Sequence, residues 1–238
     1  MLWYKAWLET KGRFLVCLIG ITAFCGYNVF RMSHEPAWQV NQAYYYSILH
    51  TGNSQVALMS LVAINFITFG GLLREKAVGA ASLTLALPFS RFHLMAVRIA
   101  VSLIETLAVM IVPWTAMFLV SAAMGRTHSI SQAMFHLSLL ATGGLIYYSV
   151  ALLASSIVEG EYVAPVVSFG AIFIIASALD GPGLRDFNPL YVMMGGTNYN
   201  THTGLLEGAL PWPQMGAFAL LTAAVVVASI RAVQAREF

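Results

Sequence analysis

Long apolar stretches that carry almost no charged side chains dominate this sequence. Of its 238 residues, 59% are hydrophobic and 9% are charged, whereas a soluble domain carries about 25% charged residues. About 20 apolar residues in a helix are enough to cross the hydrocarbon core of a bilayer, which is about 30 Å thick. The fold class is therefore predicted to be all-α, that of a polytopic membrane protein with several transmembrane helices.

Six spans are predicted within a single transmembrane domain that covers residues 1–238. Their approximate ranges are 14–30, 54–73, 93–124, 131–157, 162–179 and 213–230.

Before the first span, Leu2, Trp3, Ala6 and Trp7 recur at helical spacing. This pattern is typical of a helix that lies in the membrane interface, so an interfacial helix over 1–13 is expected. An ordinary Trp and Lys anchor in front of a span explains the same residues.

The positive charges indicate the orientation, because cytoplasmic flanks keep an excess of Lys and Arg. With six spans and the N-terminus inside, the inner flanks hold most of the 12 basic residues, namely Lys5, Lys11, Arg13, Arg74, Lys76, Arg91, Arg98, Arg231 and Arg236. The outer flanks hold Arg31, Arg126 and Arg185. Both termini are therefore expected in the cytoplasm.

The last outer connection, residues 180–212, is rich in Gly, Pro and Asn but still apolar. Irregular backbone can enter a bilayer only where protein covers its polar groups. Short re-entrant or interfacial helices are therefore expected in this connection.

A short apolar segment flanked by charges separates the second and third predicted spans. Arg74, Glu75 and Lys76 end the second span at the inner surface. Residues 77–87 are too few to cross a bilayer and too apolar for a solvated loop, and Pro88 ends any helix there. A short helix on the cytoplasmic face is expected. The residues alone leave two uses open, a loop that rests on neighbouring spans and a docking surface for a cytoplasmic partner.

This segment resembles the one after the second span in the membrane subunits of type-2 ATP-binding-cassette (ABC) exporters. The family pattern is an acidic residue, a glycine, a Leu-rich segment, Leu-Pro, a small polar residue and often Arg. The matching residues here are Glu75, Gly79, Leu83, Leu85, Leu87, Pro88, Ser90 and Arg91. The six-span plan and the N-terminal and last outer segments resemble the family as well.

The resemblance implies that residues 74–90 include a coupling helix that docks into a groove on an ATPase subunit. The residues expected to take part are Arg74, Glu75, Lys76, Gly79, Leu83, Leu85, Leu87, Pro88 and Arg91. Two membrane subunits, identical or related, would then pair with two ABC ATPases in a bacterial cytoplasmic membrane. The function implied is ATP-driven export by alternating access.

The chain carries no sequence that would bind nucleotide itself. G-x-x-x-x-G-K-[ST] is absent, and no Gly is followed by Lys. The chain is therefore not expected to be an enzyme or to bind a cofactor, and ATP and Mg²⁺ are expected on the partner ATPase. The 6 His residues lack zinc-type spacing, so no metal site is expected, although His34, His50 and His202 share the predicted outer side. Nothing predicts nucleic-acid binding.

Four polar residues inside predicted spans are candidates for lining a pathway: Asn65 and Thr68 in the second span, Glu105 in the third and Ser168 in the fifth. A charge near the bilayer centre costs at least about 2.5–3.5 kcal/mol. Glu105 therefore either lies beside a pathway or carries protons, or it is protonated or bonded to a neighbouring span. Interhelical hydrogen bonds explain the other three equally well. The alternative functions are an ATP-independent channel or carrier that uses Glu105, and a membrane assembly protein.

Small residues in two spans favour close contact between helices. Gly143 and Gly144 are adjacent in the fourth span, and Gly216 precedes Ala219 and Ala223 in the sixth. Side chains of this size let helix backbones approach one another closely in a membrane. Helix packing is the expected role of both sets.

Overall fold

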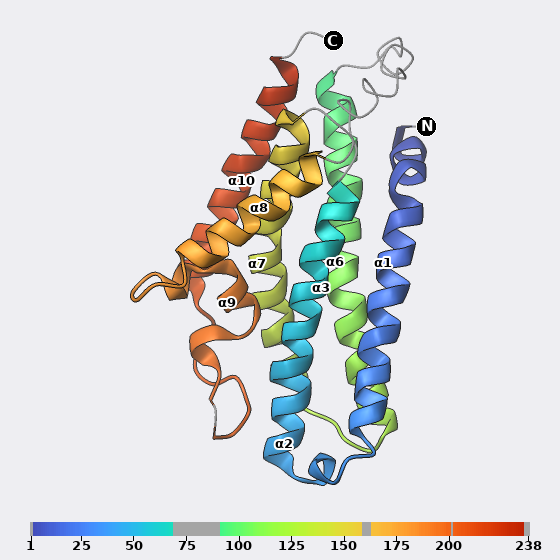
Figure 1. The fold of residues 1–238 in the computed structure, drawn as a ribbon, viewed down its shortest axis with the longest axis vertical. Coiled ribbons are helices and arrows are strands. Elements are labelled where there is room, and N and C mark those ends of the chain that lie inside the picture. Colours follow the sequence, from blue (N-terminus) through green and yellow to red (C-terminus); the bar gives the residue numbers. More distant parts are fainter. Residues whose placement is uncertain (1, 69–90, 159–162, 201, 236–238) are drawn as a thin grey trace.

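The computed structural model of the protein describes residues 2–68, 91–158, 163–200 and 202–235, which form an elongated helical bundle (Figure 1). Outside the helices, the described residues form connections and one isolated bridge between Tyr199 and Leu206. The all-α prediction is confirmed for this part of the chain.

Four helices are long and apolar enough to cross a membrane, which indicates a membrane-embedded protein. They are α1 (Leu2–Met32), α6 (Arg91–Ala123), α7 (Ile130–Ile157) and α10 (Trp212–Gln234). The N-terminal ends of α1 and α6 and the C-terminal end of α10 lie at the same end of the bundle (Figure 1).

The other two predicted spans correspond to shorter helices. α3 (Asn53–Thr68) continues without a break from α2 (Asn41–Tyr45) and the π-helix η2 (Tyr46–Gly52). α8 (Val163–Ala178) has 16 residues, or about 24 Å at 1.5 Å per residue, and crosses the bundle obliquely (Figure 1). Short helices occupy the connections: η1 (Pro36–Gln39), η3 (Arg185–Phe187), α9 (Pro189–Met193) and η4 (Gly196–Asn198).

The N-terminal segment differs from the prediction of a separate interfacial helix over 1–13. Its described residues form the first turns of α1, which runs unbroken into the predicted first span. Ala6 is buried against Val97 and Val101 of α6. Packing against a long neighbouring helix therefore holds these turns in line with the rest of α1.

The core lies where α3, α6 and α7 meet. Ile64, Met110, Leu140 and Tyr147 are completely buried there. The outward faces of α8 and α10 instead expose large apolar side chains such as Phe173 and Leu220. Exposed apolar faces of this kind are what a helix presents to lipid.

The glycines of α7 pack closely, as predicted, because α6 and α9 approach them. A Cβ atom added to Gly143 would lie 2.6 Å from the carbonyl oxygen of Pro189, and one added to Gly144 would lie 2.7 Å from Sδ of Met110. Gly216 of α10 differs, since no described residue would lie within 4 Å of its added Cβ.

Candidate functional site

A polar cleft lies between three apolar helices, α3, α7 and α8. The space in it that is open to the centre of a water molecule is about 10 Å³, and its lining residues are Asn65, Thr68, Ala151, Ser155, Ala164, Pro165 and Ser168. The structure thus brings together three of the four polar residues singled out in the sequence, although Ser168 is far from the other two along the chain. A cavity needs about 10–15 Å³ of such space to hold one water molecule, so the cleft has room for about one water or one polar group of that size.

Most hydrogen-bond donors in the cleft are directed to the backbone of their own helices. Asn65 Nδ2 donates to Leu61 O at 2.8 Å, and Thr68 Oγ1 donates to Ile64 O at 2.7 Å. Ser155 Oγ donates to Leu152 O at 2.8 Å. Oxygen lone pairs are therefore the main polar groups that these residues leave for a visiting molecule.

Two oxygen atoms in the cleft are buried and make no hydrogen bond to any described residue. They are Oδ1 of Asn65 and Oγ of Ser168, and each residue is only 2% exposed. An unpaired buried polar atom costs about 1–3 kcal/mol. The cleft therefore offers hydrogen bonds to an uncharged polar group, and none of its lining residues is ionisable.

Glu105 does not line this cleft. Its carboxylate is 1% exposed and faces α1, where Thr10 Oγ1 donates to its Oε1 at 2.5 Å. Arg13 of α1 also lies close enough to attract the carboxylate. This contact fits the interpretation in which Glu105 is bonded to a neighbouring span. It does not fit a position of Glu105 beside the cleft.

Arg98, on the same face of α6 as Glu105 in the sequence, pairs with a different acid. Its Nη2 lies 3.0 Å from Oε2 of Glu9 on α1. Arg13, one turn further along α1, donates through Nη1 to the carbonyl of Phe66 on α3 at 3.1 Å. Polar contacts from α1 therefore join α6 and α3 next to the cleft residue Asn65.

The predicted coupling residues lie almost entirely outside the described part of the chain, which omits 69–90. Those outside it are Arg74, Glu75, Lys76, Gly79, Leu83, Leu85, Leu87 and Pro88. Arg91 is the first residue of α6. Their role in coupling stays a prediction.

Two features of the bundle were missed in the sequence. Ser155 belongs to the cleft, and the Ser155-Ser156 pair at the end of a span was a usable signal. His50, His128 and His136 gather near Trp114, whereas the sequence grouped His50 with His34 and His202. No spacing rule relates these positions, because they come from three different segments.

Comparisons with known proteins add no further assignment. Neither a family model, nor a curated protein, nor a solved structure gives a significant match to this chain.

Proposed function

We propose that this chain is the membrane-embedded subunit of an ATP-driven exporter of the ABC type, with the cleft between α3, α7 and α8 as part of its substrate route. Separate ATPase subunits bind ATP and Mg²⁺ and drive the change between inward and outward access. Two membrane subunits, identical or related, complete the transporter. The proposal places it in a bacterial cytoplasmic membrane with six spans and with both termini in the cytoplasm.

The observation that carries the proposal is the pair of unpartnered oxygens, Asn65 Oδ1 and Ser168 Oγ, buried between apolar helices. Polar side chains that serve only to join helices make hydrogen bonds across the interface. These two atoms make none among the described residues, so a polar molecule that enters the cleft would offset their desolvation. A transport route requires such transient and reversible contacts.

Two features of the sequence support the proposal that a partner subunit hydrolyses ATP. The chain lacks a phosphate-binding loop, and residues 75–91 resemble the coupling segment of type-2 ABC exporters. A bound nucleotide can shift a conformational equilibrium only through a difference in affinity for the two states. Docking of this segment on an ATPase supplies such a difference.

An ATP-independent carrier that uses Glu105 is the second candidate. It rests on the burial of an acidic side chain within α6. The bond from Thr10 and the absence of Glu105 from the cleft lining favour the first candidate.

Chemical labelling of the cleft tests the proposed route. In a chain whose native Cys17 and Cys25 are replaced, Ser168→Cys is expected to react with a small maleimide at rates that differ severalfold between the nucleotide-free and the vanadate-trapped complex. The physical reason is that alternating access changes how water reaches the cleft. Mass spectrometry of the labelled chain in proteoliposomes measures the rates.

Ser177→Cys is the matched control, because Ser177 lies on the same helix and is exposed. Its labelling rate is expected to be equal in the two nucleotide states. Equal rates for Ser168→Cys in both states would exclude the cleft from the transport route.

A further inference from the structure

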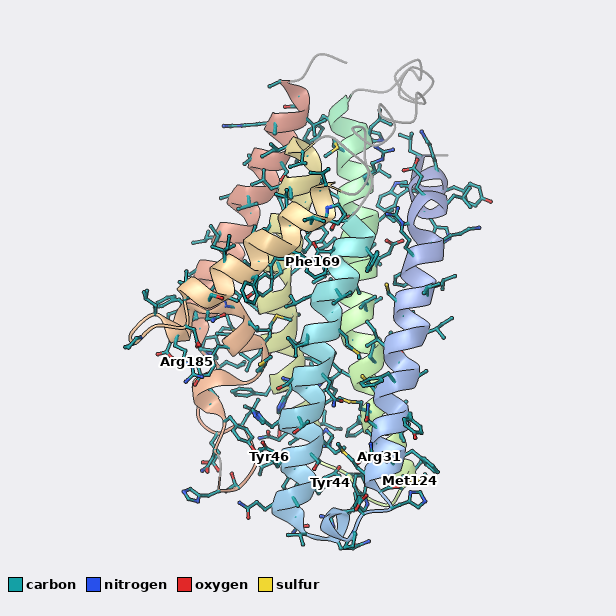
Figure 2. All side chains as sticks on the ribbon, in the orientation of Figure 1. Arg31, Tyr44, Tyr46, Met124, Phe169 and Arg185 are labelled. Carbon is teal, nitrogen blue, oxygen red and sulfur yellow. The ribbon has the colours of Figure 1, made fainter. Side chains whose placement is uncertain are left out.

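Three histidines from different segments meet at the end of the bundle opposite the chain termini. His50 belongs to η2, His128 to the connection between α6 and α7, and His136 to α7. Tyr44 marks this end in Figure 2, near Met124. His128 and His136 lie close enough to influence each other's charge, and so do His136 and His50.

Trp114 of α6 lies between two of these rings. Its indole is perpendicular to His128 with centroids 5.5 Å apart, and it stacks on His136 at 5.9 Å. Trp114, His128 and His136 are 2%, 6% and 1% exposed. The imidazoles are therefore enclosed by protein and by each other.

The hydrogen bonds define the protonated nitrogen of His136. Its Nδ1 lies 2.9 Å from the carbonyl oxygen of Gln132, which can only accept, so Nδ1 carries the hydrogen. Nε2 then keeps its lone pair and has no hydrogen-bond partner among the described residues. The Leu49 carbonyl also faces this ring, so an imidazolium could donate to two carbonyls.

A series of hydrogen bonds between hydroxyl groups defines, in the same way, which nitrogen of His128 carries the hydrogen. Ser121 Oγ donates to Arg126 O at 2.9 Å, so it accepts from the Tyr44 hydroxyl at 2.7 Å. The Tyr44 oxygen is then free to accept from His128 Nδ1 at 3.4 Å. Nε2 of His128 is left as a second buried lone pair without a partner among the described residues.

We propose that His128 and His136 form a buried proton-binding site, and that filling it loosens the contact between the connection 124–129 and the segment 41–52. At neutral pH both Nε2 atoms are bare and the site is uncharged. A proton taken up by either atom places a positive charge beside a second imidazole and an indole in an apolar interior. The Gln132 and Leu49 carbonyls offset part of its cost at His136, but at His128 such a charge is costly unless the structure opens to water.

The charged and titratable neighbours that the structure places around this site are a tyrosine, an arginine and a third histidine. Tyr44 of α2 contacts His128, and the Arg126 guanidinium lies 4.8 Å from the Tyr44 ring centroid. His50 stacks on Tyr199 at 4.3 Å and faces His136. Within the described residues, the structure gives none of the three imidazoles a carboxylate partner.

The direction in which pH changes the stability of the protein follows from His128, which lies outside the spanning helices. Burial, with a smaller contribution from His136, lowers the pKa of His128 from 6.5 to about 4. Burial also lowers the pKa of His50. A lowered histidine pKa means that, as the pH falls, the unfolded chain binds the proton before the folded chain does. The contribution of His128 to the stability of the folded chain is therefore complete above pH 6.5 and is lost as the pH falls toward 4.

Trp114 fluorescence tests the site, because a protonated imidazole quenches a neighbouring indole. The Trp114 signal is taken as the difference between the unmodified chain and Trp114→Phe, both in lipid nanodiscs. We expect a reversible loss of this signal as the pH falls from 7.5 to 4, with its midpoint below 6. The loss is expected to disappear in the double variant His128→Gln, His136→Gln and to persist in His202→Gln, whose side chain is exposed.

A Trp114 signal that stays constant over this pH range would overturn the proposal, and so would a loss that persists in the double variant. Hydrogen exchange of the unmodified chain gives an independent measurement if the double variant does not fold. After correction for intrinsic rates, residues 124–129 are expected to exchange faster at pH 4.5 than at pH 7.5. Equal corrected rates would contradict the proposed opening.

Discussion

Replacing Gly143 by alanine is expected to lower the free energy of unfolding by about 1–3 kcal/mol. The new Cβ would lie 2.6 Å from the carbonyl oxygen of Pro189 and would also overlap Met193 Cγ. The carbonyl belongs to the backbone of α9, so the contact can be relieved only by moving α9 away from α7. Denaturation in SDS, followed by circular dichroism, measures the loss.

Two matched glycines separate this effect from the general effect of an added methyl group. Gly144→Ala meets the flexible end of the Met110 side chain, so a smaller loss is expected. Gly20→Ala in α1 meets no described residue within 4 Å, and there alanine should be neutral or stabilise the helix by up to about 1 kcal/mol. A Gly143→Ala protein as stable as Gly20→Ala would contradict the packing of α9 on α7.

Replacing Glu105 by lysine is expected to destabilise the protein by about 3–5 kcal/mol, the usual cost of leaving a buried charge unpaired. The lysine would lie beside Arg13 and could not accept the hydrogen bond from Thr10. Glu105→Gln should stay within about 1 kcal/mol of the unmodified protein, because its amide oxygen can still accept that bond. SDS denaturation again measures both variants.

Glu35→Lys is the control for the charge change, since Glu35 is exposed and surface substitutions usually change stability by less than about 0.5 kcal/mol. ATP hydrolysis by the assembled complex distinguishes the two interpretations of Glu105. Normal hydrolysis and assembly with Glu105→Gln fit a structural role. Normal assembly with lost hydrolysis would instead favour a place for Glu105 beside the transport pathway.

The sequence predicted helix type and position well, because long apolar runs constrain a chain strongly. The fifth span was expected over 162–179 and α8 covers Val163–Ala178. Its oblique path was not predictable from composition, since tilt depends on neighbouring helices. The unbroken α1 was missed for a related reason: the burial of Ala6 against α6 is a tertiary contact that an amphipathic pattern does not reveal.

Three of the polar residues that line the cleft were singled out in the sequence, but not as a unit. Asn65 and Thr68 are three positions apart, so helical geometry places them on one face. Ser168 comes from another helix, and only the packing of α8 against α3 and α7 brings it to the same cleft. The histidine cluster could not be predicted for the same reason. Membrane topology predicts at which end of the bundle a residue lies, but not which residues it contacts there.

Copurification with an ATPase tests the central claim most directly. We expect the tagged chain, extracted from its native membranes, to carry with it an ABC ATPase that mass spectrometry identifies by its phosphate-binding loop. The variant Leu83→Asp, Leu85→Asp, Leu87→Asp should insert into the membrane normally and lose this partner, whereas Leu184→Asp, at an exposed position on another connection, should keep it. An unmodified chain without any such ATPase, or a triple variant that retains it fully, would contradict the account.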